Sequence, residues 1–561
     1  MKKIMFTALI FMLFVTSISF GQLVTKVMSY NGPGNQIDKC TGIVQDKFGY
    51  VYATGVSWGS GTAKEDYATI KFGEDGDYIW AVRYNGPGNN LDYASAITID
   101  DDGNIYVTGW SRSGSDYGTE DYCTIKYNNN GQQLWVKRFD GAVGNDCHYY
   151  DYARAIFVDT DGNVYVTGES LGNDDLNGDY LTLKYNSAGT LLWSKRYNGP
   201  SSKNDNALSI SVDFAGNVFV TGGSQQQGKG YDYLTVKYNS AGTQQWAARY
   251  DGPAYLDDIA KELKLDGAGN VYITGSSHGG TSKLDYATIK YNTSGQQQWL
   301  KRYTNTGIND TDAATGLDLD VFSNVYVTGY SKAPGSASYD YVTIKYLTFD
   351  GSQQWLDRVD GGLSDKAWDI RVINKSCIAS GMHGNEGDIP CWDIFVYLTG
   401  ESMKSGNGID FLTVSYKDNG THRWTVRYNG PQNANDAAYS ISTKAMYPVI
   451  YAGGSFSNDY GIIGIAELTR TSPIDYSGLS SSYPNPFNPS TTISYRVAKE
   501  TIVKISVFDV LGREVSSLVN EKKPEGDYTV TFDASNLNSG VYFYRVETDY
   551  ASETQKIVLI K

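Results

Sequence analysis

The chain has 561 residues and a formal net charge of −15, with 61 Gly and 46 Tyr. A single ordinary core does not reach this length, so several domains or a repeat array are expected. The negative charge and the lack of a basic patch argue against a nucleic-acid partner. The abundance of glycine and aromatic residues favours many short strands joined by tight turns over helices.

The N-terminus has the pattern of a secretory signal peptide. Two lysines precede the apolar run over residues 4–15, and the small residues Ser19 and Gly21 stand shortly before Gln22. This order is typical of a cleaved export signal. The apolar run is too short to cross a bilayer comfortably, and no later segment approaches about 18 apolar residues. We therefore expect residues 1–21 to be removed and the mature chain to be exported without a transmembrane segment.

A four-segment unit recurs along most of the chain. Each unit contains Asp-x-Ala leading into an apolar segment, then Asn-Val-Tyr-Val-Thr-Gly, Asp-Tyr-x-Thr-Ile-Lys-Tyr-Asn and Gly-x-x-x-Trp-x-x-Arg-Tyr. All four alternate with period two and are separated by turn residues, which predicts antiparallel strands. The spacing is about 54 residues, with one longer step of about 71. The second segments end at Gly55, Gly109, Gly168, Gly222, Gly275, Gly329, Gly400 and, in degenerate form, Gly453.

The two ends of the array are incomplete and complement one another. Residues 26–33 match the last segment of a unit, whereas residues 436–468 supply the first three segments. This predicts a closed ring in which the N-terminal strand pairs with the C-terminal sheet. We therefore predict an all-β fold with a β-propeller over residues 22–469. Eight blades are favoured, and seven are expected if the degenerate last unit folds differently.

The repeats end before the C-terminus. A linker rich in Ser, Pro and Gly is expected over residues 470–482. Six strand-like runs follow, which predict a small immunoglobulin-like β-sandwich over residues 483–561. The runs cover residues 491–497, 502–509, 514–519, 528–532, 541–547 and 555–560.

Both parts of the chain resemble known families. The motif Tyr-Pro-Asn-Pro-Phe-Asn-Pro-Ser-Thr-Thr-Ile from residue 483, Phe-Asp-Val-Leu-Gly from residue 508 and Leu-Asn-Ser-Gly-Val-Tyr from residue 537 resemble the type A C-terminal sorting domain of type IX secretion substrates. The repeats resemble the bacterial propeller repeat abbreviated SBBP, which implies architecture but no defined activity. The marker residues of the sorting motif are Pro484, Asn485, Pro486, Phe487, Gly512 and Gly540.

The first resemblance implies a route to the cell surface. It implies recognition by the type IX secretion machinery, removal of the C-terminal domain, and release or attachment at the outer cell surface. The alternative is that the domain stays attached as a plain sandwich. Either outcome places the mature protein outside the cell.

An aspartate opens the first segment of every unit. If first strands line the propeller axis, these eight carboxylates ring one mouth and attract a cation, with weak calcium binding as the ionic hypothesis. The alternative is that each carboxylate accepts hydrogen bonds from backbone N–H groups of its own inter-blade turn. The eight are Asp38, Asp92, Asp151, Asp205, Asp258, Asp312, Asp365 and Asp436.

The remaining patterns predict no catalytic or cofactor-binding residue. Gly-x-Ser-x-Gly occurs three times at the same place in the repeat and between strands, so it indicates structure rather than a hydrolase elbow. None of the four His has metal-ligand spacing. The five Cys leave at least one without an intramolecular partner, and Cys377 and Cys391 are the best candidates for a disulfide.

These observations favour an exported, non-catalytic binding or scaffold module. It would bind a glycan or a protein through face loops, with specificity sought in two inserts, between Cys377 and Cys391 and between Gly144 and Asp151. The first alternative is an extracellular hydrolase or lyase acting on a polymer, which requires convergent carboxylates in a cleft. The second is a quinoprotein-like oxidoreductase, suggested by the recurring Gly-x-x-x-Trp.

Overall fold

The computed structural model contains β-strands as its only regular elements in the part of the chain that it describes. That part comprises residues 23–60, 64–114, 119–141, 150–172, 177–280, 283–305, 311–332, 338–377, 391–404, 408–430, 435–443, 449–457, 459–466, 479–497, 501–510, 512–524, 526–548 and 552–561. The predicted signal peptide lies outside it. Within these ranges, no helix of the length and apolarity needed to cross a membrane occurs.

Seven four-stranded antiparallel sheets follow one another from Lys39 to Tyr428, each formed by four consecutive strands. Blade 1 contains β2 (Lys39–Gln45), β3 (Val51–Trp58), β4 (Glu65–Phe72) and β5 (Tyr78–Tyr84). Blade 2 contains β6 (Asp92–Ile99), β7 (Ile105–Arg112), β8 (Glu120–Tyr127) and β9 (Gln133–Phe139). Blade 3 contains β10 (Asp151–Val158), β11 (Val164–Leu171), β12 (Gly178–Tyr185) and β13 (Leu191–Tyr197). Blade 4 contains β14 (Asp205–Val212), β15 (Val218–Gln225), β16 (Tyr231–Tyr238) and β17 (Gln244–Tyr250).

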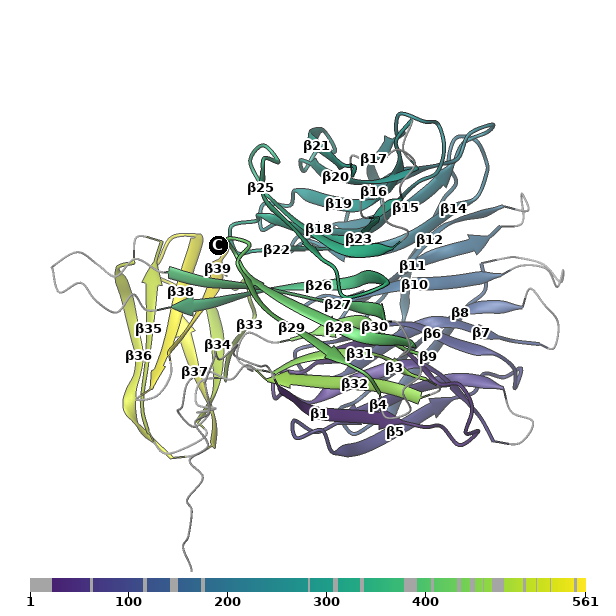
Figure 1. The fold of residues 1–561 in the computed structure, drawn as a ribbon. Helices are drawn as coiled ribbons and strands as arrows, with labels where there is room; N and C mark the ends of the chain where they lie inside the picture. The colour runs from purple at the N-terminus through teal and green to yellow at the C-terminus, as the bar shows by residue number, and fades with distance from the viewer. Residues whose placement is uncertain are drawn as a thin grey trace, which may run out of the picture.

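The same order continues in the next three blades. Blade 5 contains β18 (Asp258–Leu265), β19 (Val271–His278), β20 (Leu284–Tyr291) and β21 (Gln297–Tyr303). Blade 6 contains β22 (Asp312–Leu319), β23 (Val325–Lys332), β24 (Tyr339–Tyr346) and β25 (Gln353–Val359). Blade 7 contains β26 (Ser364–Cys377), β27 (Cys391–Lys404), β28 (Gly408–Lys417) and β29 (His422–Tyr428). Figure 1 shows these sheets side by side.

Blade 8 joins the two ends of the repeat array. Its strands are β1 (Leu23–Tyr30), β30 (Asp436–Ser442), β31 (Val449–Phe456) and β32 (Asp459–Ala466), in the order β1-β32-β31-β30. Lys26 lies opposite Gly464 and Tyr30 opposite Tyr460. The first strands of successive blades contact one another around the ring, and β2 contacts both β6 and β30. The prediction of eight blades closed by the N-terminal strand is therefore confirmed.

Buried tyrosines of the third strands connect seven of the eight blades to the next one, whereas blade 7 has Phe411 at this position. Their hydroxyls donate to a backbone carbonyl in the third strand of the following blade, at O···O distances of 2.9–3.2 Å. A buried hydroxyl needs such a partner, and the carbonyl of the next blade supplies it. Tyr460 of blade 8 donates to Ala68 of blade 1 and so closes the ring. The donors are Tyr67, Tyr122, Tyr180, Tyr233, Tyr286, Tyr341 and Tyr460.

The recurring tryptophan of the fourth strand makes a second inter-blade contact. In blades 1–6 its Nε1 donates to a carbonyl in the last turn of the following blade, at 2.7–3.2 Å. A glycine of that turn lies under the ring. Gly295, which has φ +78°, is an example: a Cβ atom added to it would lie only 2.6 Å from Cδ2 of Trp246, which is too close for a side chain. The Gly-x-x-x-Trp pattern therefore encodes packing between blades.

Every first strand contains a β-bulge. In blade 3, Ala153 pairs with Gly168 and Ala155 with Thr167, so Arg154 has no partner in the ladder. A bulge bends its strand and redirects the extra side chain. The residues at this position are Thr41, Ser95, Arg154, Leu208, Lys261, Thr315, Trp368 and Tyr439. These positions vary widely in chemistry, while the alanine before them is almost constant.

Blade 7 carries the insertion expected from the longer repeat step. Its strands β26 and β27 have 14 residues each and extend beyond the neighbouring strands (Figure 1). The backbone register places Cys377 opposite Cys391. Their side chains lie outside the described residues, so the disulfide stays a prediction. Cys40 and Cys123 are buried free cysteines.

The C-terminal unit contains two sheets, in the orders β33-β34-β37 and β36-β35-β38-β39. Its strands are β33 (Leu479–Tyr483), β34 (Ser490–Val497), β35 (Thr501–Asp509), β36 (Glu514–Lys523), β37 (Gly526–Asp533), β38 (Gly540–Thr548) and β39 (Ser552–Leu559). Strand β33 begins inside the expected linker, because its backbone pairs with β34 despite its Ser-rich composition. The core contains Phe487, Ile505 and Tyr544, all at most 2% exposed.

Candidate functional site

The eight first-strand aspartates lie buried between blades. Each is at most 1% exposed. Each accepts a hydrogen bond from a backbone N–H of the turn that precedes its strand, at 2.5–2.8 Å. This is the geometry of the turn alternative that the sequence left open. Burial raises the pKa of Asp92 to about 6 and that of Asp151 to about 7.

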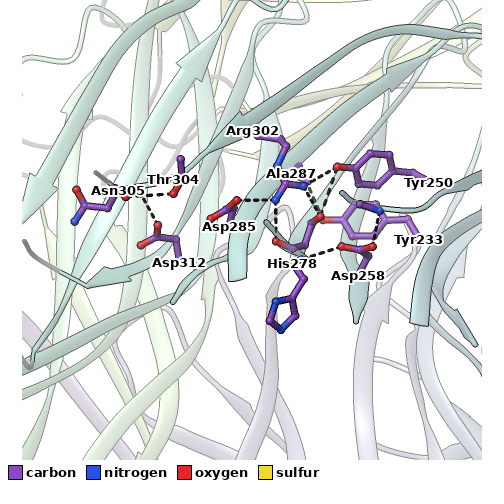
Figure 2. A network of polar contacts seen from close by, with 12 residues as sticks. Tyr233, Tyr250, Asp258, His278, Asp285, Ala287, Arg302, Thr304, Asn305 and Asp312 are labelled. Atoms are coloured by element: carbon purple, nitrogen blue, oxygen red, sulfur yellow. Dashed lines mark hydrogen bonds and ion pairs between the residues drawn. The ribbon is translucent and has the colours of Figure 1, made fainter. Parts of the chain in front are cut away.

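An arginine of the fourth strand extends this turn into a network that sequence reasoning missed. In blades 1–7 it pairs with the aspartate that opens the third-strand motif, at N···O distances of 2.5–3.3 Å. Figure 2 shows the network of blade 5, in which Arg302 bonds to Asp285 at 2.6 Å and to Tyr250 of blade 4 at 2.7 Å. Arg302 also donates to the carbonyl of Ser277 at 3.0 Å.

The serines of Gly-x-Ser-x-Gly belong to the same network. Ser57, Ser170 and Ser277 each accept a hydrogen bond at Oγ from the arginine of their own blade. All three are buried. A serine that is fully buried and bonded to an arginine is not accessible to a substrate, so the structural interpretation of this motif fits the geometry.

Three groups of carboxylates approach closely enough to share an ion. They are Asp121, Asp140 and Asp151; Asp232, Asp251 and Asp258; and Asp340, Asp360 and Asp365. Among the described residues, each group contains one of the eight predicted aspartates together with two other carboxylates. In each group a carboxylate also pairs with an arginine, as Asp232 does with Arg249 at 2.8 Å. Cation binding by these aspartates stays a prediction.

The sorting-motif residues hold the C-terminal unit together. Phe487 is 2% exposed; its N–H donates to Val558 O at 2.9 Å and its carbonyl accepts from Ile560 N at 3.0 Å. Asn485 Oδ1 accepts from Val558 N at 2.9 Å, and Pro484 and Pro486 flank it in the sequence. Gly512 adopts φ +76° in the turn between β35 and β36. Gly540 pairs with Leu559 at the start of β38.

Aromatic side chains gather in two arrays near the starts of the first strands. The first array joins Tyr93, Trp110, Tyr152 and Tyr150 of blades 2 and 3, with successive ring centroids 5.7, 5.6 and 4.8 Å apart. The second array joins Tyr339, Tyr330, Trp368 and Tyr439 of blades 6, 7 and 8, at 5.3, 6.0 and 6.4 Å. We call the two arrays together the axial rim.

Four of the eight rings of the axial rim belong to first strands, which contact one another around the ring of blades, and the rim is partly open to solvent. Tyr439 is 43% exposed, and the other seven rings are half-buried. Tyr93 contributes to the raised pKa of Tyr439, after burial and Glu401. Blade 1 separates the blades that carry these two tyrosines, so they approach each other across the axis. Burial also raises the pKa of Tyr93, Tyr152 and Tyr330.

Charged side chains lie beside both arrays. Lys366 stands 5.7 Å from the ring centroid of Tyr330 and pairs with Glu401 at 3.3 Å. Arg154 stands 5.3 Å from the ring centroid of Tyr152. Tyr150 OH donates to Glu169 Oε1 at 3.1 Å. The rim therefore combines electron-rich ring faces with hydrogen-bonding groups and cations, a composition suited to binding a polar ligand that has flat faces.

The two predicted specificity inserts lie outside the described residues, which omit residues 142–149 and 378–390. Their role in binding stays a prediction.

Comparison with known proteins finds a family in each part of the chain. The model of the secretion system C-terminal sorting domain matches residues 481–561. The model of the beta-propeller repeat matches residues 79–117 and 148–175. This chain is a propeller-repeat protein with a type IX sorting domain. The sorting domain directs this propeller-repeat protein out of the cell, to the medium or the cell surface, and makes the type IX secretion machinery its partner.

Individual relatives are distant. No curated protein matches the propeller-repeat protein. PorZ, a surface component of the type IX secretion system of Porphyromonas gingivalis, is 14% identical over 92% of this chain and 70% of its own, with a TM-score of 0.37. The propeller domain of the Trilobed protease from Pyrococcus furiosus is 6% identical over 66% of this chain and 92% of its own, also with a TM-score of 0.37. At these scores neither likeness carries an inference about function.

Proposed function

We propose that this exported propeller is a non-catalytic binding module that holds a glycan on the axial rim. The observation that carries the proposal is the two arrays of four aromatic rings around the axis. Ring faces are electron-rich, and the C–H bonds on one face of a sugar carry partial positive charge, so the two stack favourably. Tyr and Trp provide this contact area with little loss of conformational entropy.

The rim also supplies the polar contacts that a sugar requires. The hydroxyls of the rim tyrosines donate and accept hydrogen bonds, and Glu169, Glu401 and Lys366 lie beside the rings. A binding site of this kind orients its ligand with a few polar groups among mostly apolar contacts. The ring-to-ring packing holds the aromatic faces in place before binding, which lowers the entropic cost of association.

The geometry favours a binder over the polymer-degrading enzyme. An enzyme of that class needs two carboxylates that face a substrate. The carboxylates that lie closest together among the described residues are engaged by arginines and turn N–H groups between blades. The half-buried and exposed groups near the starts of the first strands instead include two arrays of aromatic rings, which is the pattern expected of a binding surface.

A glycan array and quantitative titration test the proposal. The mature chain should retain one class of glycan, and Trp110→Ala or Trp368→Ala should weaken that binding about tenfold or more. Phe349→Ala is the matched control, because Phe349 is an aromatic residue, 89% exposed, on the turn after β24. Thermal melting checks that each variant is folded.

Three outcomes would count against the proposal. Unchanged affinity in both tryptophan variants would remove the rim as the site. Retention of a cell-surface protein but of no glycan would assign the rim to a protein partner. New reducing ends in the incubated polymer would contradict the non-catalytic part.

A further inference from the structure

Two cations face the propeller axis beside the first aromatic array. Arg154 and Lys261 occupy the bulge positions of β10 and β18, and both side chains are exposed. They belong to blades 3 and 5, and blade 4 separates these two blades. Side chains of non-adjacent blades approach each other only across the axis. Lys261 is accessible to solvent, but the protein around it partly desolvates its ammonium group and lowers its pKa, and the charge of Arg154 lowers the pKa further, which agrees with this placement.

Neither cation is neutralised by an ion pair. In the part of the chain that the structure describes, Arg154 contacts the ring of Tyr152 at 5.3 Å but forms no salt bridge, and Lys261 forms none either. Arg154 does interact electrostatically with Glu169. Burial raises the pKa of the Glu169 carboxyl, and the positive charge of Arg154 lowers it. The third rim cation differs, because Lys366 pairs with Glu401 at 3.3 Å.

The space between the two cations is the part of the mouth that attracts an anion. The chain carries a formal net charge of −15, and Glu169 lies within electrostatic reach of Arg154, so the attraction is confined to this space. Two cations held near each other repel, and an anion between them offsets that repulsion. Arginine suits a planar anion because its guanidinium forms two parallel hydrogen bonds with a carboxylate.

We propose that the axial rim binds an acidic polysaccharide, with a carboxylate or sulfate group between Arg154 and Lys261 and the adjoining sugar rings on Tyr152, Tyr150 and Trp110. This inference rests on the proposed function and adds the chemical class of the ligand. The aromatic array and Arg154 lie side by side on blade 3, because Arg154 stands two positions after Tyr152 in the same strand. One strand thus supplies both the stacking face and the charge.

Titration calorimetry of the mature chain tests this inference with three polymers. Polygalacturonate carries carboxylates, dextran sulfate carries sulfates, and dextran is neutral. We expect one or both acidic polymers to bind at least tenfold more tightly than dextran, with an affinity that falls as salt is raised. The preferred acidic polymer identifies which anionic group the cation pair accepts.

Charge variants locate the anion. Arg154→Gln and Lys261→Gln should each weaken acidic-polymer binding about tenfold, the loss expected for one charge-assisted hydrogen bond. Lys417→Gln changes the net charge equally at the exposed last residue of β28 and should leave binding unchanged. Arg154→Lys should restore part of the affinity. Melting temperatures should stay within about 1 °C, because both side chains are exposed.

The results separate this inference from the proposed function. If dextran or another neutral glycan binds through Trp110 with no preference for acidic polymers, the inference is overturned and the proposed function stands. If both charge variants bind acidic polymers as the wild type does, the cation pair is excluded as their site. If acidic polymers bind through Arg154 and Lys261 but Trp110→Ala has no effect, anion binding stands and stacking on the rim is refuted.

Discussion

Replacing a first-strand aspartate tests whether these residues hold the turns between blades. Asp258 is fully buried and accepts from Gly252 N at 2.6 Å and from His278 N at 2.9 Å. Asp258→Ala leaves both N–H groups without an acceptor, at about 1–3 kcal/mol each. Asp258→Ala also removes a carboxyl group whose charged form is disfavoured by burial, as its raised pKa shows, and this offsets part of the destabilisation. We therefore expect a net loss of about 2–3 kcal/mol.

The size of the propeller makes the thermal effect small but measurable. If its roughly 440 residues unfold together, the unfolding entropy is about 0.9 kcal/mol per kelvin, so Tm falls by about 2–3 °C. Asp258→Asn keeps one acceptor oxygen and should lose about half as much. Asp101→Ala, on an exposed turn, should shift Tm by less than about 0.5 °C.

Differential scanning calorimetry with and without calcium distinguishes the two roles of Asp258. The turn role predicts the same loss in Asp258→Ala with calcium or with chelator. A Tm of Asp258→Ala equal to that of Asp101→Ala would refute the reasoning. A loss that appears only with calcium present would instead assign the carboxylate to an ion site.

Three further predictions follow from the inter-blade contacts. Tyr233→Phe removes the buried hydrogen bond to Ala287 O at 3.1 Å and should cost about 1 kcal/mol, or about 1 °C in Tm, and an unchanged Tm would show that the bond is not stabilising. Burial raises the pKa of Asp92 to about 6 and of Asp151 to about 7, so the folded chain holds more protons than the unfolded chain above about pH 4. The stability that these two protonated carboxyls give to the folded chain is present at pH 4 and is lost as pH rises through 7. Tm should therefore fall between pH 5 and 7.5, and it should fall less in Asp151→Asn. A mature chain that begins at Asn31 lacks β1 and exposes the edge of β32, so size-exclusion chromatography should show association that the chain from Gln22 does not show.

The architecture could be predicted from the sequence because each strand carries its own pattern. Period-two alternation and turn residues define four strands per unit, and the partial units at the two ends define how the ring closes. The inter-blade bonds of Tyr233 and Trp246 are local consequences of those same segments. The start of β33 was missed, because pairing with β34 overrides a Ser-rich composition that by itself indicates a linker.

The axial rim could not be predicted in the same way. In the sequence, Ala153-Arg154-Ala155 looks like the regular alternation of a strand. Only the strand register shows that Arg154 is the extra residue of a bulge and has no partner in the ladder. Trp110 and Trp368 lie outside the Gly-x-x-x-Trp motif, and the sequence does not show which rings lie beside them in space. One signal was available: positions that vary between units while their surroundings stay constant. Those positions hold the aromatic and cationic residues of the rim.

The most direct test of the glycan-binding account is a crystal structure of the mature chain with an oligosaccharide of the class retained in the titrations. The account predicts sugar rings on the faces of Trp110 and Tyr152, with an acidic group between Arg154 and Lys261. An oligosaccharide bound at the outer edges of the blades, or beside the hairpin of β26 and β27 at the other end of the strands, would contradict it.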